Sequence, residues 1–155
     1  MVNSAASPAR AAWIATLAKA PLALLEECLR TLGPLPSYQL LRPPETGLAM
    51  VRGRSEGTGD PFNLGEMTLT RCVVQIVQSD HPVIAGFGYV AGRSHRHAEL
   101  AALCDALLQH DGWAAGVHAQ VLAPLQAAAQ TQQAAAAAQT EATRVNFFTL
   151  KRGES

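Results

Sequence analysis

A short segment between a predicted strand and a predicted helix combines groups that could bind an anion. Gly92 ends the strand and Ser94 is placed to cap the helix, so backbone amides are exposed at a helix N-terminus, where negative charge is favoured. Arg93 and His97 could complete a site for a phosphate-like anion. The alternative is that Arg93 pairs with a carboxylate such as Glu99, while His97 caps the helix or packs inside.

A carboxylate and an arginine in the preceding strands are the next candidates. Glu45 follows Pro43 and Pro44, which restrict the loop and could aim its side chain as a general base or hydrogen-bond acceptor. A turn carboxylate more often satisfies local amides. Arg71 follows Thr70 in a strand, where successive side chains point to opposite faces, so only one can face a given site. Arg71 needs an acceptor, either a carboxylate or a phosphate.

Other chemistry-bearing residues favour structural roles. His95 and His97 lie two apart in a predicted helix and point away from each other, so we expect no metal site. The Gly-Phe-Gly at residues 86–88 and the Gly-Thr-Gly at residues 57–59 match no nucleotide-binding motif, and glycines in a strand more often allow a bulge or a close backbone approach. Cys104 is expected in a helix core.

Two helices open the chain. Ser7 followed by Pro8 is a helix start, with a hydroxyl to cap free amides and a proline in the first turn. Pro21 opens a second helix, which has an apolar face and ends at Gly33. We expect an antiparallel helical hairpin within residues 1–33.

A sheet follows the helices. Short extended segments are predicted at residues 38–42 and 47–53, separated by the diproline, and a polar glycine-rich loop at residues 55–63. The threonine- and valine-rich residues 66–78 predict a long strand, paired antiparallel with residues 87–91 across a turn.

Helices return after this sheet. Residues 126–143 are mostly alanine and glutamine, without glycine or proline, and predict a helix that is a solvated spacer or a surface for a partner, with disorder as a third option. Residues 145–150 predict a final strand. The chain is therefore expected to be an α+β domain, with the hairpin and further helices packed on a mainly antiparallel sheet.

Composition limits the function. The 155 residues suffice for one core but are few for an enzyme with its own enclosed site, which favours a subunit or a binding module. The 12 basic and 12 acidic residues balance without a basic stripe, which argues against nucleic-acid binding. Small clusters of basic residues suit a small anion or an acidic partner surface, although such a cluster is more commonly a solvated face. These clusters lie at Arg42, Arg52 and Arg54, at Arg93, His95, Arg96 and His97, and at Arg144, Lys151 and Arg152.

The location is expected to be a reducing cytoplasm. The three cysteines, Cys28, Cys72 and Cys104, form no CxxC pair, which argues against a disulfide framework and a metal site. No apolar run approaches the roughly 20 residues that span a bilayer, and the first ten residues lack signal-peptide character.

Four glycine-punctuated motifs resemble those of a known family. They are Glu-Thr-Gly-Leu at residues 45–48, Gly-Glu-Met-Thr-Leu-Thr-Arg at 65–71, Gly-Phe-Gly-Tyr-Val-Ala-Gly-Arg at 86–93 with His-Ala-Glu at 97–99, and Arg-Val-Asn-Phe-Phe-Thr-Leu-Lys-Arg-Gly at 144–153. In this order the set closely resembles the PhnG family, small subunits of the bacterial carbon-phosphorus lyase system that takes phosphonates apart. Lys151 departs from the pattern, since an apolar residue is expected there.

The resemblance implies a function at the level of a complex. It implies a subunit of an ATP-dependent synthase that transfers the ribose triphosphate moiety of ATP to an alkylphosphonate and releases adenine. The partners would be PhnI, usually considered the catalytic subunit, together with PhnH, PhnJ, PhnL and a second copy of this chain. ATP would be a substrate of the complex, with no cofactor bound by this chain. One PhnG-like domain would cover residues 1–155, with its sheet at 36–92, helices at 94–143 and last strand at 144–153.

The resemblance also suggests roles for single residues. Glu45, His97 and Glu99 become candidate catalytic residues, and Arg71 and Arg93 candidate phosphate or phosphonate ligands. The expected partner interface contains Phe147, Phe148, Arg144 and Arg152. Two alternatives stay open: a non-catalytic assembly subunit of the same complex, or a free-standing module that binds small anions.

Overall fold

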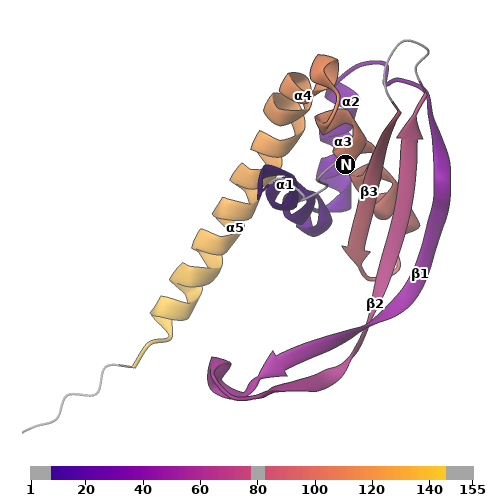
Figure 1. Cartoon of the computed structure of the whole chain (residues 1–155). Helices are drawn as coiled ribbons and strands as arrows, with labels where there is room; N and C mark the ends of the chain where they lie inside the picture. The colour runs from indigo at the N-terminus through magenta and orange to yellow at the C-terminus, as the bar shows by residue number, and fades with distance from the viewer. Residues whose placement is uncertain (1–7, 78–82, 146–155) are drawn as a thin grey trace, which may run out of the picture.

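The computed structural model describes residues 8–77 and 83–145 and has the expected α+β architecture. Figure 1 shows the helices gathered on one face of a three-stranded antiparallel sheet with the strand order β1-β2-β3. The strands are β1 (Tyr38–Arg54), β2 (Pro61–Ile76) and β3 (Ile84–Ala91), with a 3-10 turn, η1 (Ser55–Gly57), after β1. The helices are α1 (Pro8–Lys19), α2 (Leu22–Thr31), α3 (His95–Leu108), α4 (Asp111–Val117) and α5 (Ala123–Ala142), with a π-helical turn, η2 (His118–Leu122), before α5.

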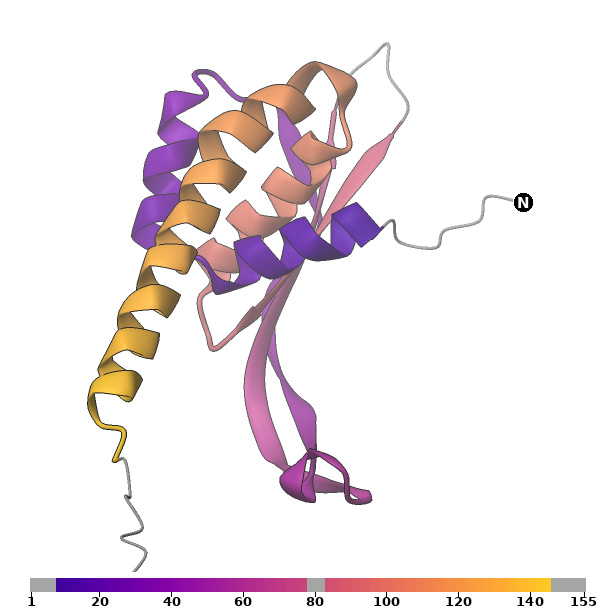
Figure 2. The same cartoon turned by 90° about the vertical axis from the view of Figure 1, so that its left-hand side faces the viewer.

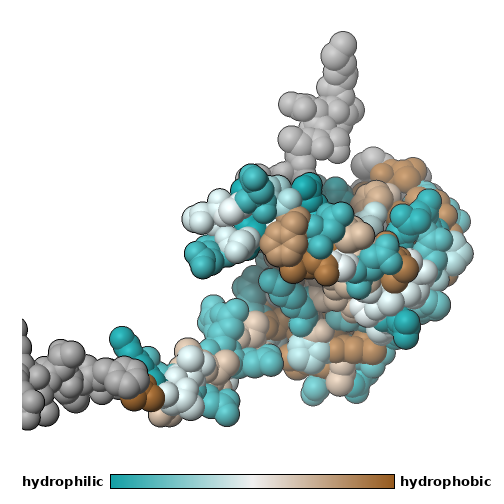
Figure 3. Space-filling view, turned by 90° about the horizontal axis from the view of Figure 1, so that it is seen from below, coloured by the Kyte–Doolittle hydropathy of each residue, from teal (hydrophilic) through white to brown (hydrophobic). Residues whose placement is uncertain are grey.

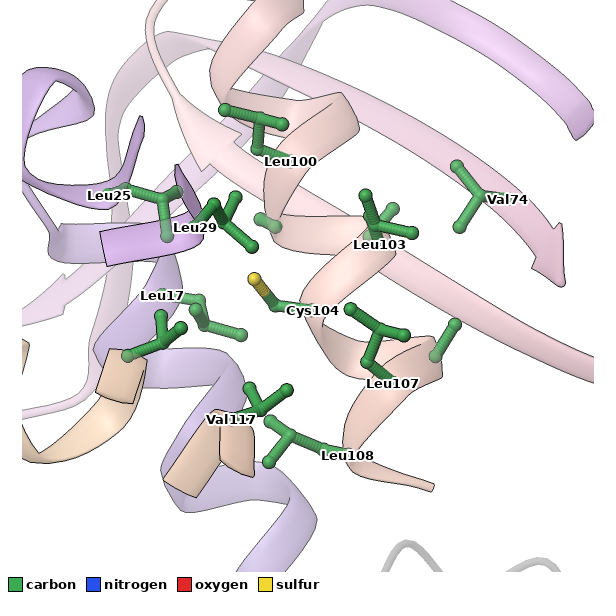
Figure 4. Packing of buried hydrophobic residues seen from close by; sticks show 14 of the residues in the cluster. Leu17, Leu25, Leu29, Val74, Leu100, Leu103, Cys104, Leu107, Leu108 and Val117 are labelled. Atoms are coloured by element: carbon green, nitrogen blue, oxygen red, sulfur yellow. The ribbon is translucent and has the colours of Figure 1, made fainter. Parts of the chain in front are cut away.

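Helix α3 is the centre of the core and lies very close to β3. A Cβ atom at Gly86 or Gly88 would overlap the carbonyl oxygen of Ala102 or Ala98, so glycine is what permits this approach. Cys104 is fully buried among leucines from α1, α2 and α3, as expected (Figure 4). The Gly-Phe-Gly sequence therefore serves packing.

The two N-terminal helices are present but do not form an antiparallel hairpin. Figure 2 shows α1 and α2 running in clearly different directions from the corner that the chain turns at Pro21, whose backbone is extended. Helix α1 packs mainly on α3 and β3, whereas α2 packs mainly on η2. Each apolar face is buried against a different neighbour, which the spacing of apolar residues along the chain could not distinguish.

The diproline does not interrupt β1, contrary to expectation. The strand runs through it, and the register with β2 shifts on both sides of Arg42, so Pro43 and Pro44 sit in an irregularity at the sheet edge. This position suits residues that cannot donate to a strand ladder. The predicted loop after β1 is also shorter than expected, because β2 already begins at Pro61.

The far ends of β1 and β2 form a two-stranded arm, defined here as residues 48–68. Strand β3 pairs with β2 only from Leu69 to Ile76, so the arm extends beyond the third strand and projects from the body (Figures 1 and 2). Large apolar side chains are exposed on it. A two-stranded ribbon of this kind is marginally stable in water by itself.

The C-terminal half is more continuous than expected. Helix α4, the turn η2 and helix α5 follow one another without a break, and the alanine-rich stretch is helical up to Ala142. All residues from 129 to 145 are exposed. None of the helices within the described ranges is long and apolar enough to cross a membrane. Most of the predicted last strand, and the turn at residues 80–82, lie outside the described residues.

Candidate functional site

Glu45 and Arg71 form an ion pair across β1 and β2. They are direct partners in the register, and Arg71 Nε donates to Glu45 Oε1 at 2.6 Å, while Arg42 Nη1 donates to the same oxygen at 3.0 Å. The hydrogen bond from Arg71, together with the charges of Arg71 and Arg42, holds the pKa of Glu45 below its usual value. Glu45 is therefore ionised at neutral pH and is better suited to accept a hydrogen bond than to remove a proton.

Arg71 keeps donors available in this arrangement. Only Nε is engaged, and its terminal nitrogens make no hydrogen bond to any residue in the described part of the chain. Thr70, one position earlier, is fully buried, so the strand alternation predicted for these two residues is confirmed. Glu45 thus orients a planar guanidinium whose other edge faces solvent, a geometry that suits the oxygens of a phosphate or phosphonate.

A chain of hydroxyl groups orients His95 near the same strands. Thr70 Oγ1 donates its only hydrogen to Gly92 O at 2.7 Å, so in the 3.0 Å contact between Thr46 and Thr70 the Thr46 hydroxyl is the donor. The 3.2 Å contact between Thr46 Oγ1 and His95 Nε2 then requires the imidazole to donate. Nε2 therefore carries a hydrogen. Nδ1 makes no contact in this chain of hydroxyl groups and is available to another partner.

The structure separates Arg93 from His97. The cap predicted at Ser94 is confirmed, since its hydroxyl accepts from His97 N at 3.3 Å. The His97 ring points inward and bonds Leu17 O at 2.8 Å, which joins α3 to the end of α1. Arg93 is exposed and has no hydrogen bond or ion pair with another residue in the described ranges. Arg93 is therefore available to an external anion, whereas His97 faces the interior.

Glu99 takes part in a separate polar group between β1 and α3. Tyr38 donates its phenolic hydrogen to Glu99 Oε1 at 2.6 Å, and Arg96 lies 3.6 Å from the other oxygen. Burial raises the pKa of Tyr38, and the bond to Glu99 raises it further. Arg96 also reaches Glu26 on α2 at 3.3 Å. Arg93 does not pair with Glu99, so that alternative reading of Arg93 is wrong.

Asp105 is a buried carboxylate that the sequence reasoning missed. Its oxygens accept from Arg10 at 2.7 and 3.1 Å, from Trp13 Nε1 at 2.9 Å, from Phe87 N at 2.9 Å and from Gln109 Nε2 at 3.3 Å. The side chain is fully buried, and this hub ties α1 and the outer edge of β3 to α3. The signal was present: a lone acidic residue inside an apolar helical stretch needs paired donors.

Cys72 and Cys104 are fully buried. Burial raises the pKa of Cys104 to about 12 and that of Cys72 to about 11, so both thiols stay protonated and unreactive at neutral pH. Arg144 is exposed and pairs with Glu141 at 3.2 Å. The other expected interface residues, Phe147, Phe148 and Arg152, lie outside the described residues.

Comparisons of the sequence with known proteins agree with the resemblance of its motifs. A family model described as "Phosphonate metabolism protein PhnG" matches residues 8–153. The chain is also 41% identical over 141 residues, 89% of its length and 85% of the relative, to a protein of Rhizobium meliloti (strain 1021) named alpha-D-ribose 1-methylphosphonate 5-triphosphate synthase subunit PhnG. These matches define a protein of phosphonate metabolism. The chain belongs to the PhnG family, which confirms the resemblance of its four motifs.

Proposed function

We propose that this chain is a subunit of an alpha-D-ribose 1-methylphosphonate 5-triphosphate synthase. The support is the identity to the Rhizobium subunit of that name, which extends over most of both chains. The reaction would transfer the ribose triphosphate of ATP to an alkylphosphonate with release of adenine. PhnI, PhnH, PhnJ and PhnL would be its cytoplasmic partners, beside a second copy of this chain. ATP would be a substrate of the complex.

Within that complex, the exposed arginines would bind the anionic substrates. Arg71, oriented by Glu45, and Arg93 both present guanidinium donors to solvent. The second oxygen of Glu45 accepts no hydrogen bond within the described residues and could face a ribose hydroxyl or the positive charge that develops as adenine leaves. His97 and Glu99 would support the site by fixing α3 against its neighbours.

A purely structural role in assembly is the second candidate. The arm and the exposed alanine-rich end of α5 both offer surfaces that a partner could cover, and neither needs to supply a reacting group. In this case Arg71 and Arg93 would pair with acidic residues of the partner instead of with substrate.

Turnover per assembled complex distinguishes the two candidates. Arg71→Ala and Arg93→Ala would be co-expressed with the partner subunits and compared with Arg30→Ala, an exposed arginine bonded only to the backbone of its own helix. The catalytic proposal expects the first two to lose adenine release while the complex still purifies intact. Arg93→Lys should also release adenine more slowly than wild type, because lysine keeps the charge but lacks the planar fork of donors. Loss of assembly alone would favour the structural role, and unchanged turnover would exclude direct substrate contacts.

A further inference from the structure

The arginines of this chain divide into two groups by their partners. Within residues 8–77 and 83–145, ion pairs to carboxylates are formed by Arg10, Arg42, Arg71, Arg96 and Arg144. In these same ranges, Arg30, Arg52, Arg54 and Arg93 form none, and of these only Arg52 and Arg54 are close neighbours in the chain, with Glu56 and Asp60 in the adjoining turn. Neither guanidinium group is therefore engaged by a carboxylate in a direct ion pair, although the acidic residues of the turn balance the formal charge of the tip.

These two arginines lie at the tip of the arm. Arg52 and Arg54 end β1, and their partners Asn63 and Pro61 keep a regular register, so the two side chains leave the same face of the ribbon. Gly53 between them faces the other way, where the Leu64 side chain covers it.

The tip also contains a hollow. It has a volume of about 470 Å³ and is lined by Arg52, Gly53, Arg54, Gly57 and Pro61. Arg54 Nη1 donates to Gly59 O at 3.0 Å, which holds the guanidinium against the turn and leaves its other nitrogens unbonded in the described structure. Arg52 is exposed beside it. The hollow therefore offers the donors of two guanidinium groups to one ligand.

The rest of the arm exposes several large apolar side chains. Leu48, Met50, Phe62 and Leu64 are between 48% and 66% exposed. Figure 3, which looks at the molecule from below, shows hydrophobic residues on the surface among hydrophilic ones. Exposed apolar groups of this size on a projecting ribbon mark a protein contact. A partner that covers the arm would bring Arg52 and Arg54 to its own surface.

We propose that the arm tip is a binding site for the triphosphate group of the nucleotide, which Arg52 and Arg54 contribute to the reaction site of a partner subunit. This site is distinct from the one that Arg71 and Arg93 border in the same copy, because ten residues of β2, about 33 Å, separate Pro61 from Arg71. This inference rests on the proposed function, because only that function supplies a triphosphate-bearing substrate. Guanidinium groups match this ligand, since each planar fork can hold two phosphate oxygens at once. An acidic surface of the partner protein is the competing ligand.

The test uses the assembled complex and four variants. Arg54→Ala, Arg54→Lys and the double variant Arg52→Ala/Arg54→Ala are compared with Arg30→Ala. Adenine release gives KM for ATP and for methylphosphonate, and inorganic tripolyphosphate serves as a competing probe. We expect KM for ATP to rise about tenfold or more in the alanine variants. Tripolyphosphate inhibition should weaken in parallel, with little change in KM for methylphosphonate or in assembly. Arg54→Lys should raise KM for ATP less than Arg54→Ala does.

Three outcomes would overturn this inference. An unchanged KM for ATP would show that the tip does not contact the triphosphate. Loss of co-purification, reversed by lower salt, would assign the arginines to an acidic protein surface. An equal rise for both substrates would indicate a general distortion of the site. If the proposed function itself is wrong, the wild-type complex will release no adenine. In that case, direct binding of tripolyphosphate to the wild-type and variant complexes still tests the arm tip.

Discussion

Glu45 and Arg71, which are 26 residues apart in the chain, face each other on neighbouring strands at 2.6 Å. The carboxylate holds the Nε edge of the guanidinium and leaves the terminal nitrogens toward solvent. An anion can therefore bind Arg71 without displacing Glu45. The pair therefore presents an oriented guanidinium donor to solvent.

Replacing Glu45 should separate its charge from its hydrogen-bonding role. Glu45→Gln keeps an acceptor for Arg71 and should retain more activity per assembled complex than Glu45→Ala, which frees the guanidinium to move.

The lowered pKa of Glu45 predicts a pH dependence of stability. Ionised Glu45 contributes stability above its unfolded pKa of about 4.3, and this contribution is lost as the pH falls through the folded value. The stability difference between wild type and Glu45→Gln, measured by urea unfolding, should shrink in acid. A constant difference would contradict this.

Asp105 should be the most sensitive polar position in the core. Asp105→Ala removes the acceptor for Arg10, Trp13 and the Phe87 amide, and we expect a loss of about 3 kcal/mol in the free energy of unfolding. Arg10→Ala should cost less, because Trp13, the Phe87 amide and Gln109 still donate hydrogen bonds to the carboxylate. Urea unfolding with each variant measures both values. A larger loss for Arg10→Ala than for Asp105→Ala would mean that the arginine, and not the carboxylate, organises the hub.

The close contact between β3 and α3 can be tested with one added methyl group. Gly88→Ala would place a Cβ against the carbonyl of Ala98, so either the helix or the strand must move, at a cost of about 2 kcal/mol or more. Gly47→Ala is the matched control, because a Cβ there meets open space. Thermal unfolding should show a lower Tm for Gly88→Ala only. A similar Tm for both variants would contradict the tight packing.

The cysteines should resist alkylation in the folded protein. Cys72 and Cys104 are fully buried, and burial raises their pKa values to about 11 and about 12, so thiolate forms only well above neutral pH. Iodoacetamide should label neither residue at pH 8 without denaturant, and both in denaturant, as read by mass spectrometry. Rapid labelling of Cys104 under native conditions would indicate that the core opens.

The alanine-rich helix should matter for assembly before chemistry. Ala136 lies on the exposed part of α5, where glycine costs about 1 kcal/mol of helix stability and proline about 3 or more. Ala136→Pro should reduce co-purification with the partner subunits, and Ala136→Gly should do so less. Turnover per assembled complex should change little. A proline variant that assembles normally but loses turnover would bring this helix close to the reaction.

Local patterns were sufficient for several features of this protein. The strand alternation that buries Thr70 and exposes Arg71, the Ser94 cap, the helical alanine-rich segment and the burial of Cys104 depend on neighbours within a few residues or on side-chain character. The four motifs were sufficient to identify the family. These conclusions needed no knowledge of distant contacts.

Other features depend on contacts between distant segments, which the chain order alone does not specify. The pairing of Glu45 with Arg71 follows from the register shift around the diproline, and a one-residue change in register would turn that carboxylate to the other face. The inward turn of His97 depends on the end of α1, which supplies the carbonyl of Leu17. Asp105 could be recognised as a hub only when α1 and β3 were in place, because its donors come from both. Sequence therefore determined the elements and the family, and the tertiary structure decided which polar groups are satisfied internally and which remain exposed to bind a ligand.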